Sequence, residues 1–385
     1  MPSEQFRLID LIDDMCDGKD VFFRSVRFTR DVMTKNVKTL TLDDTINTCI
    51  KFMRDNKVRH VPVMDTSTEK EDEPYFVGVI SERDLFRQIS PFVGKIGETD
   101  TDTKALQEPL GHIVTREPHF VSPKTPVPDM ISVMVDNHVD IVPVLADGQL
   151  ISIVTSEDIL KFFVRLDMIR QLCTKAGTDG KQAKKRKLVD LISGGSGEMA
   201  ATLLSVFQTV QDIMTEEVVC LQEQDDLAKV METMQKGKFR HVPILDKQKR
   251  IVGIVSDRDV LRHLPYLPYP QRQRALQAET FRGLLFSVDP KDPSLKLHLS
   301  RVMTVDVISV SPSCGFYDAA KKLHEKRVSC LPVLNSEKEI QGIVTTTDVM
   351  RSLLAAYELS EKAEANSASA SSLPEENELA QKISV

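Results

Sequence analysis

A short apolar strand that ends in a dense group of polar residues is the feature of this sequence best suited to chemistry. In GIVSDRDV, residues 253–260, the strand is followed by Ser256, Asp257, Arg258 and Asp259. A hydroxyl and a carboxylate three residues apart at a helix start can form a capping box, worth about 1 kcal/mol without a ligand. The same groups can bind a ligand, because an ionised aspartate accepts bonds from ribose hydroxyls and a helix N-terminus suits a phosphate. Both interpretations stay open at this point.

The motif occurs four times, at constant spacing from other short motifs. It recurs as VISERDL, IVTSEDI and IVTTTDV, each after a proline strand such as VRHVPV or FRHVPI. Upstream of each strand lies a DVMT-like tetrapeptide. The spacing from its threonine to the proline is identical in all four copies: Thr34 to Pro62, Thr115 to Pro143, Thr215 to Pro243 and Thr304 to Pro332. Chance does not preserve such a spacing four times, so the chain contains four repeats.

Each repeat is predicted to form a β-α-β-β-α unit. In the third repeat, Leu227, Val230, Met231 and Met234 recur at helical spacing. Short β-branched runs such as HVPIL and IVGIVS predict strands. A unit of about 50–55 residues has too small a core to be stable alone. We therefore expect a mixed α/β (α+β) fold in which the repeats pack as two tandem pairs.

The intervals between the repeats predict the domain organisation. An N-terminal segment (1–30) precedes the repeats, and a Ser-, Ala- and Glu-rich tail (360–385) is expected to be disordered. The repeats are expected at 31–90, 109–165, 212–265 and 300–356, with an inter-pair linker at 166–211. The basic run KQAKKRK (181–187) in this linker is interpreted as a solvated charge run, with a localisation or nucleic-acid signal as the alternative.

Composition narrows the class of protein. The 385 residues are 28% charged with a net charge of −7, which argues against a general nucleic-acid binder. No apolar run approaches the roughly 20 residues that span a bilayer, and the six cysteines form no CxxC pair. The N-terminus lacks a signal-peptide pattern. We expect a cytoplasmic protein without membrane contact. Since no P-loop, nucleophile elbow or HExxH motif is present, we predict no catalytic residue and no metal site.

These repeated motifs resemble the cystathionine β-synthase (CBS) domain family, whose units run β-α-β-β-α and close with a G-h-x-S/T-x-x-D pattern. The pattern stands here as GVISERD, GIVSDRD and GIVTTTD, and with a departure as SISIVTSED, where Ser152 replaces the glycine. The resemblance implies tandem pairs with ligand clefts, which in this family hold AMP, ADP, ATP, S-adenosylmethionine or related adenosine compounds. Four-repeat chains of similar architecture include the γ regulatory subunits of AMP-activated kinases.

The resemblance also assigns candidate site residues. The ribose candidates are the closing aspartates Asp84, Asp158, Asp259 and Asp348, with the hydroxyl partners Ser81, Thr155, Ser256 and Thr345. Only the first and third repeats carry an Arg-His pair before the proline and an arginine in the closing motif, and guanidinium groups bind phosphates in a bidentate manner. The phosphate candidates are therefore Arg59, His60, Arg83, Arg240, His241 and Arg258. The alternative is that these arginines pair with surface acids and that the histidines are structural.

The residues after the DVMT-like start are where the family contacts the base. Val37, Val218 and Val307 take that place here. Pro118 stands at the aligned position of the second repeat and removes one backbone donor, which weakens that repeat's case. Gly253 would let a base lie close to its strand. These positions are equally consistent with ordinary strand residues.

Two functions of different classes follow. The favoured one is a regulatory module that binds an adenine nucleotide and transmits its ligand state to a protein partner that the sequence does not identify. The second is a constitutive scaffold or kinase-type regulatory subunit with vestigial ligand clefts. A stand-alone nucleotide-processing enzyme is a third and less favoured reading. Whether the two pairs meet within one chain or through a homodimer stays open.

Overall fold

The computed structural model describes residues 28–34, 36–67, 74–89, 100–164, 207–264 and 291–371. Most of the predicted N-terminal segment, most of the linker with its basic run 181–187, and the end of the tail lie outside these residues. No helix among the described residues is long and apolar enough to cross a bilayer.

The first two repeats follow the predicted element order. The first contains η1 (Thr29–Asp31), β1 (Leu40–Thr41), α2 (Ile46–Asn56), β2 (His60–Asp65), β3 (Tyr75–Ser81) and α3 (Glu82–Phe86). After α4 (Asp100–Ala105), the second contains η2 (Leu110–His112), β4 (Thr115–Arg116), α5 (Val127–Asp136), β5 (Ile141–Ala146) and β6 (Gln149–Thr155). A further helix covers residues 156–164.

The third repeat has the same plan, and in the fourth a single parallel bridge between Val310 and Val333 takes the place of the first strand. The third contains η3 (Val210–Asp212), β7 (Leu221–Gln222), α9 (Leu227–Gly237), β8 (His241–Leu245), β9 (Ile251–Ser256) and α10 (Asp257–His263). The fourth contains η4 (Pro293–Lys296), η5 (Leu299–Arg301), α13 (Phe316–Lys326), β10 (Cys330–Leu334), β11 (Ile340–Thr345) and α14 (Thr346–Ser371). Helix α9 buries the four residues that its spacing predicts and begins at the N-cap Asp226, whose side chain accepts from Lys229 N.

Each proline strand forms an antiparallel hairpin with the strand before the closing motif. In the first repeat Pro62 lies opposite Val79, and in the third Pro243 lies opposite Ile254. The short strands β1 and β7 add in parallel to β2 and β8. The hairpins therefore place every closing motif at the end of a buried strand and at the start of a helix.

Repeats one and two form one pair, and repeats three and four form the other. Strand β4 of the second repeat pairs antiparallel with β3 of the first, with Val79 opposite Thr115. In the second pair, single bridges join Thr215 to Ile343 and Ile254 to Thr304. Each pair is thus held by segments that cross from one repeat to the other.

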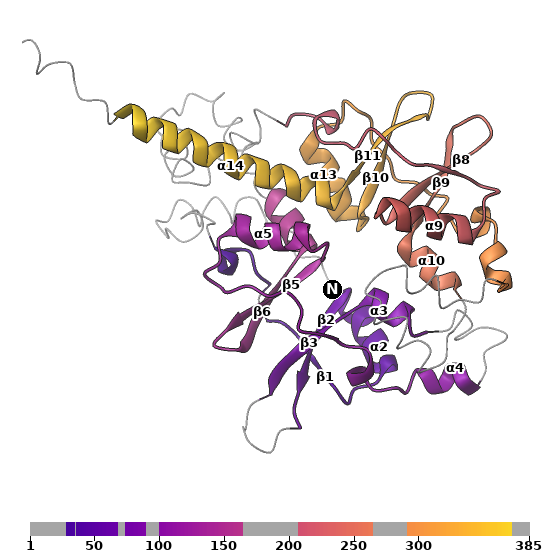
Figure 1. Ribbon diagram of the computed structural model, residues 1–385, viewed down its shortest axis with the longest axis horizontal. Coiled ribbons are helices and arrows are strands. Elements are labelled where there is room, and N and C mark those ends of the chain that lie inside the picture. The colour runs from indigo at the N-terminus through magenta and orange to yellow at the C-terminus, as the bar shows by residue number, and fades with distance from the viewer. Residues whose placement is uncertain are drawn as a thin grey trace, which may run out of the picture.

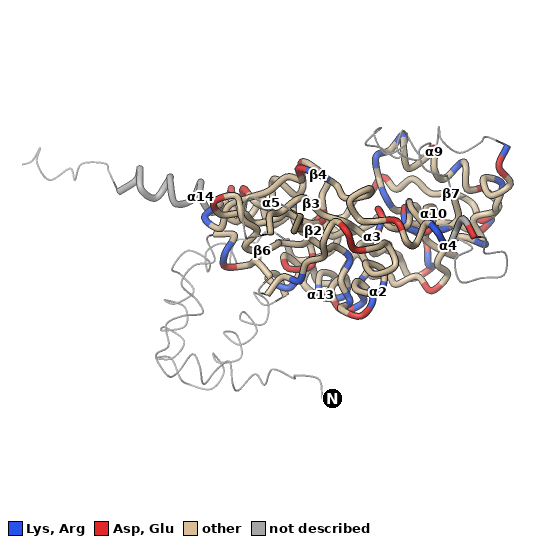
Figure 2. The backbone as a smooth tube through the Cα atoms, turned by 90° about the horizontal axis from the view of Figure 1, so that it is seen from below, with Lys and Arg blue, Asp and Glu red and all other residues tan. Residues whose placement is uncertain are grey.

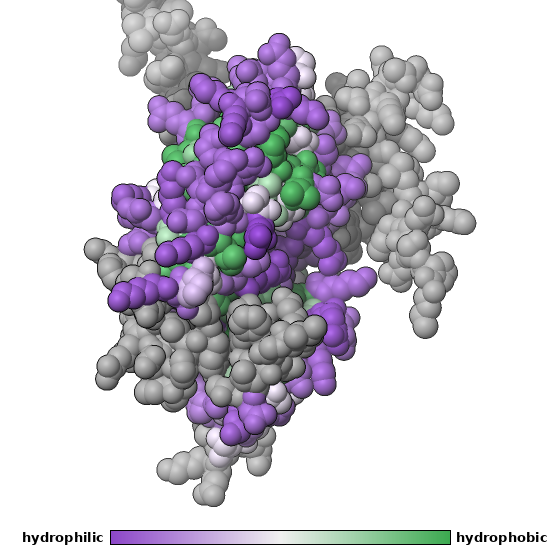
Figure 3. All heavy atoms as spheres, turned by 90° about the vertical axis from the view of Figure 1, so that its right-hand side faces the viewer, coloured by the Kyte–Doolittle hydropathy of each residue, from purple (hydrophilic) through white to green (hydrophobic). Residues whose placement is uncertain are grey.

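The two pairs meet within this one chain. Figure 1 shows α5 of the second repeat beside α14 of the fourth, and α3 of the first repeat facing α10 of the third; both helix pairs are in contact. One apolar core is continuous through repeats two and four, whereas repeats one and three have separate cores. The face with the third repeat, seen in Figure 3, shows mostly hydrophilic described residues with small hydrophobic patches between them.

The C-terminal helix is longer than the composition predicts. Helix α14 continues to Ser371, so residues 360–371, assigned from the sequence to a disordered tail, are helical. Alanine, glutamate and lysine have high helix propensity, and a helix anchored in the core can extend through them. The anchor is the buried first part of α14, which includes Leu353 and Ala356.

Candidate functional site

All four closing motifs form the same capping box. In the first repeat, Asp84 Oδ2 accepts from Ser81 N at 2.8 Å and from Ser81 Oγ at 2.6 Å, while Ser81 Oγ accepts from Asp84 N. The third repeat has the same bonds between Ser256 and Asp259. The second and fourth repeats form the same bonds, between Thr155 and Asp158 and between Thr345 and Asp348. One oxygen of every candidate ribose ligand is therefore engaged in the cap.

The second oxygen of each aspartate faces a basic residue that the sequence reasoning missed. In the first repeat Arg87 Nη1 lies 3.6 Å from Asp84 Oδ1. The equivalent pairs are Lys161–Asp158 at 3.5 Å, Arg262–Asp259 at 3.5 Å and Arg351–Asp348 at 3.9 Å. The signal is visible in the sequence as a basic residue three positions after all four aspartates. Such partly exposed pairs are weak, so Oδ1 remains open to a ligand hydroxyl.

Each closing motif is bordered by the threonine segment of the other repeat in its pair. Thr34 N donates to Ile153 O at 2.9 Å, and Thr34 Oγ1 donates to Asp158 Oδ2 at 3.0 Å. In the second pair, Thr215 N donates to Ile343 O and Thr304 N donates to Ile254 O. Each base candidate therefore comes just after a threonine that borders the closing motif of the other repeat in its pair. Val37 is associated with the motif of the second repeat, Val218 with that of the fourth and Val307 with that of the third.

This crossing changes the consequence of Pro118. Pro118 follows Thr115, which pairs with Val79 in the closing strand of the first repeat. The backbone donor that Pro118 lacks is therefore missing beside the closing motif of the first repeat, which contains Asp84. The sequence had predicted that it would be missing from the site of the second repeat. The sequence could not show the actual position, because the exchange of segments between repeats is a long-range feature of the pair.

The glycines of the closing strands have a packing role. A Cβ atom at Gly253 would lie 2.4 Å from Met303 Sδ, and one at Gly78 would lie 2.1 Å from the carbonyl oxygen of Thr115. The crossing segment thus occupies the space that the sequence analysis gave to a base beside Gly253. Where Ser152 replaces the glycine, its Oγ donates to the carbonyl oxygen of Thr34. The departure from the family pattern is therefore accommodated by a hydrogen bond.

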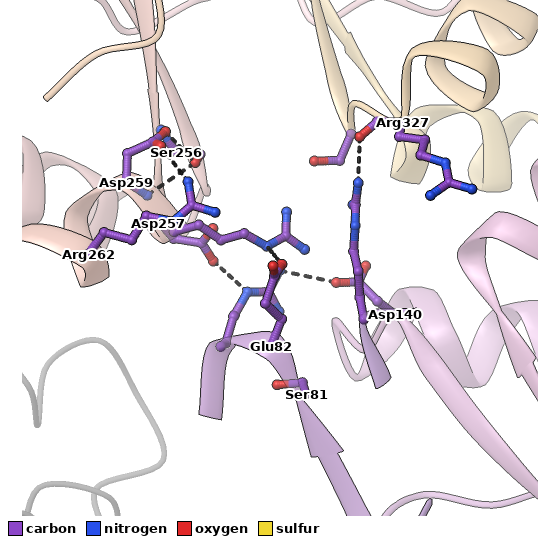
Figure 4. Close-up of polar contacts among 12 residues, drawn as sticks. Ser81, Glu82, Asp140, Ser256, Asp257, Asp259, Arg262 and Arg327 are labelled. Carbon is purple, nitrogen blue, oxygen red and sulfur yellow. Dashed lines mark hydrogen bonds and ion pairs between the residues drawn. The ribbon is translucent and has the colours of Figure 1, made fainter. Parts of the chain in front are cut away.

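The closing-motif arginines form reciprocal ion pairs between the first and third repeats. Arg83 Nε lies 2.7 Å from Asp257 Oδ2, and Arg258 Nε lies 3.1 Å from Glu82 Oε2. Figure 4 shows Glu82, Asp257 and Asp140, from three different repeats, turned toward the same central space. Figure 2 shows acidic and basic segments side by side where α3 and α10 come together. The dipeptides Glu82-Arg83 and Asp257-Arg258 are thus complementary in charge across the junction.

The two arginines before the proline strands reach the same region. Arg240 Nη1 lies 2.9 Å from Asp140 Oδ2, which also lies 3.1 Å from Arg83 Nη2. Arg59 Nη2 donates to the carbonyl oxygen of Arg327 in the fourth repeat at 2.5 Å. We call Arg59, Arg83, Arg240 and Arg258 the arginine cluster. Its contact partners lie in all four repeats.

The charges of this cluster are unequal. Among the described residues, three carboxylates contact its four guanidinium groups, those of Glu82, Asp140 and Asp257. Burial lowers the pKa of Arg258, and the positive charges of Arg83 and Arg59 lower it further. Burial alone would raise the pKa of Asp140, but Arg240 and Arg83 lower it far below its usual range. An excess of positive charge at a partly buried site favours the binding of an anion.

The two candidate histidines lie beside the cluster and are neutral at pH 7. Burial is the largest cause that lowers the pKa of His60 and of His241 to about 4, and the neighbouring arginines add to it. His241 Nε2 and Ser329 Oγ are 3.0 Å apart, which joins the third repeat to the fourth. A phosphate near these rings would favour their charged form and raise both pKa values.

The structure therefore brings the predicted phosphate candidates together and leaves the four aspartates in separate capping boxes. Among the described residues, no group of three or more His, Cys, Asp or Glu side chains could hold a metal ion. The chemistry that the arrangement supports is recognition of an anion by guanidinium groups, next to carboxylates placed at helix starts.

Comparison with known proteins identifies the repeats. Residues 30–91, 110–165, 210–266 and 299–355 match the model of the CBS domain, and together they make up more than half of the chain. Uncharacterized protein MJ1404 of Methanocaldococcus jannaschii is 24% identical over 323 residues, which cover 84% of this chain and 61% of that protein. The chain thus matches about three fifths of the length of this relative.

A second relative is similar in both sequence and structure. Protein MJ1225 of Methanocaldococcus jannaschii is 25% identical over 234 residues, covering 61% of this chain and 69% of that protein. Its crystal structure, proposed as an archaeal homolog of g-AMPK, gives a TM-score of 0.53 at 19% identity and covers 84% of this chain and 99% of that chain. The predicted fold of four repeats in two tandem pairs is confirmed.

Proposed function

Because this chain belongs to the CBS domain family, with four repeats in two tandem pairs, we propose that it is a regulatory sensor of adenine nucleotides. The ligand is AMP, ADP or ATP, with S-adenosylmethionine as a further adenosine compound to test. The module transmits its ligand state to a protein partner and performs no catalysis of its own. This reading extends the favoured interpretation of the sequence.

One observation carries the proposal: four guanidinium groups converge beside two closing motifs and, among the described residues, have three carboxylate partners. Guanidinium groups recognise phosphate oxygens in a bidentate manner. The motifs of the first and third repeats supply Asp84 and Asp259, each with one oxygen free of the cap. A nucleotide could place its ribose at either aspartate and direct its phosphates into the arginine cluster.

The remaining candidates have secondary roles in this proposal. His60 and His241 border the phosphates, and the hydroxyls of Ser81 and Ser256 orient the aspartates. In the second and fourth repeats, Asp158 and Asp348 with Thr155 and Thr345 offer ribose sites whose motifs carry no arginine between the threonine and the aspartate. Val37, Val218 and Val307 would contact bases, each for the motif of the neighbouring repeat.

Transmission follows from the position of the cluster. Arg83 and Arg258 hold the first repeat to the third through their ion pairs. A ligand that draws these arginines toward its phosphates weakens those pairs and changes the contact between α3 and α10. It shifts the arrangement of the two halves only by its difference in affinity for the two arrangements.

A constitutive scaffold is the second candidate, and a specific observation favours it. All four aspartates are satisfied as caps, and each arginine of the cluster has a protein partner. In that case the site is structural, and the surface of the chain binds its partner without a nucleotide.

Thermal unfolding with AMP, ADP, ATP and S-adenosylmethionine separates the two candidates. A ligand at about 100 times its Kd stabilises the folded state by roughly 2.7 kcal/mol, which shifts the melting temperature measurably. The test variant is Asp259→Ala, and the matched control is Asp226→Ala, which removes the N-cap of α9. Each substitution removes a cap worth about 1 kcal/mol.

A sensor requires that a nucleotide stabilises the wild type and Asp226→Ala but stabilises Asp259→Ala less. If none of the four ligands shifts the wild type, while both variants melt earlier to a similar extent, the scaffold is the correct reading.

A further inference from the structure

Asp140 occupies a singular place among the four repeats. The aligned residues before the proline strands are Arg59, Asp140, Arg240 and Ser329. Asp140 is the acid of this set, and its Oδ2 lies 3.1 Å from Arg83 Nη2 and 2.9 Å from Arg240 Nη1. One carboxylate oxygen of the second repeat thus bridges two guanidinium groups from the first and third repeats.

This is the arrangement in which a phosphate oxygen is held. An anionic oxygen between two guanidinium groups receives short, charge-assisted hydrogen bonds from both. The carboxylate of Asp140 therefore takes the position and the charge that a ligand oxygen would take. Its side chain is 21% exposed, and the residue lies in a bend ahead of β5, where its carbonyl oxygen accepts from Ser156 N at 3.0 Å.

We propose that Asp140 is a built-in competitor for the anionic ligand of the arginine cluster. A ligand reaches Arg83 and Arg240 by displacing the Asp140 carboxylate. This competition sets the negative charge that a ligand needs in order to bind. Tripolyphosphate chains, with several anionic oxygens, meet this requirement more readily than a monophosphate. The inference rests on the proposed function and adds to it a residue that determines charge selectivity.

The other contacts of the cluster are suited to exchange. Arg83 Nε and Arg258 Nε face their carboxylates at ion-pair distance, but without the alignment of a hydrogen bond. Arg59 contacts a carbonyl oxygen, so its charge has no carboxylate partner among the described ion pairs. A phosphate group can offer these guanidinium groups better aligned acceptors than they have without it.

The test measures anion affinity in variants of Asp140. Inorganic tripolyphosphate, ATP and AMP are titrated into the full chain by calorimetry at fixed ionic strength. Asp140→Asn keeps the shape of the side chain and removes its charge. Asp140→Ser introduces the residue that the fourth repeat has at the aligned position, which provides a second variant if Asp140→Asn fails to fold. The control is Asp147→Asn, at an exposed residue of the β5–β6 turn.

Loss of the competitor should tighten the binding of tripolyphosphate and ATP at least tenfold and that of AMP less. The same variants should melt earlier than the wild type without ligand, because Arg83 and Arg240 lose their shared partner. This opposite change in stability and affinity is not expected of a residue that only supports the fold. Asp147→Asn should change neither quantity.

The outcomes separate this inference from the proposed function. If the wild type binds ATP and the Asp140 variants bind it equally or more weakly, the inference is overturned and the proposed function stands. If the variants gain tripolyphosphate affinity but no form of the protein prefers ATP over tripolyphosphate, the competitor is supported and adenine recognition is refuted. If no form binds any of these anions, both are refuted.

Discussion

The two junctions between the pairs differ in their main contacts, which are apolar in one and charged in the other. Between the second and fourth repeats, Phe163 lies 4.7 Å from Phe316 and 4.5 Å from Tyr317 between ring centroids, inside a continuous apolar core. Here a polar contact, His324 Nδ1 to Glu157 Oε1 at 2.6 Å, accompanies the core. Between the first and third repeats, the ion pairs of Arg83 and Arg258 join the closing motifs. Phe86 adds a smaller apolar contact with the core of the third repeat, and the Arg262 guanidinium lies 4.6 Å from its ring centroid.

This difference assigns different tasks to the two sides. An apolar core is close-packed, and it resists rearrangement because each displaced side chain loses many contacts at once. Ion pairs with partly exposed carboxylates, here those of Glu82 and Asp140, can exchange the protein carboxylate for a ligand anion at small net cost. Under the proposed function, the second and fourth repeats would therefore be the fixed side of the molecule, and the first and third the side that responds to an anion.

The largest effect expected of a single substitution comes from breaking the fixed side. Phe163 is fully buried, so Phe163→Ala should destabilise the chain by about 3–5 kcal/mol, from lost transfer energy and the cavity that remains. Chemical denaturation monitored by circular dichroism measures this. Phe163→Leu is the control and should cost about a third as much. A loss below 1 kcal/mol for Phe163→Ala would show that the aromatic contacts do not hold the junction.

Acidification should lower the folding stability through two histidines of the first and third repeats. The folded-state pKa of His60 and of His241 is about 4, below the ordinary value of 6.5. Between these values the unfolded chain binds more protons than the folded one, so stability is full above pH 6.5 and falls as the pH is lowered to 4. The loss is about 3 kcal/mol for each histidine.

Denaturation midpoints from pH 7 to pH 4 test this dependence. His60→Gln and His241→Gln should each make the denaturation midpoint less dependent on pH, and the double variant should depend on pH least. His119→Gln is the control, because His119 is exposed. An unchanged slope in the double variant would show that these rings are not the groups that resist protonation.

The ion pairs should give a smaller energy that depends on salt. A double-mutant cycle with Arg83→Gln and Asp257→Asn should show a coupling of about 1–2 kcal/mol, because Asp257 is almost fully buried beside Arg83. High salt should reduce this coupling only in part, because buried charges are screened less than exposed ones. The same salt should leave the cost of Phe163→Ala unchanged. A coupling of zero at low salt would remove the contrast between the junctions.

A contact inside one pair gives the smallest effect and a baseline for both junctions. Ser152 Oγ donates to the carbonyl oxygen of Thr34 across the first pair. Ser152→Gly restores the family pattern and removes this bond, so we expect a loss of about 1 kcal/mol. Gly253→Ser should be worse, because its Cβ would lie 2.4 Å from Met303 Sδ. If Gly253→Ser is neutral in urea denaturation, the crossing segment does not pack as described.

Much of the fold could be predicted from local signals. Helix α9 begins at Asp226 and buries its predicted face, and the four capping boxes form where Ser or Thr precedes Asp by three residues. These features depend on neighbours along the chain. They follow from periodicity and capping chemistry alone.

The site could be predicted only in part, because its partners are distant in sequence. The sequence identified Arg83 and Arg258 but not their carboxylate partners in the facing repeat. It showed an Arg-His pair before the proline in the first and third repeats only, yet it could not show that Asp140, at the aligned position of the second repeat, lies between two arginines. Such contacts are fixed by the packing of the two pairs, which leaves no periodic pattern in the chain.

Hydrogen–deuterium exchange with and without ATP tests most directly whether the polar junction is the anion-responsive side. The account predicts that saturating ATP changes exchange in peptides that cover β3–α3 and β9–α10, while peptides of α5 and of residues 346–356 in α14 stay as they are. No change anywhere, or a change greatest at α5 and α14, would contradict it.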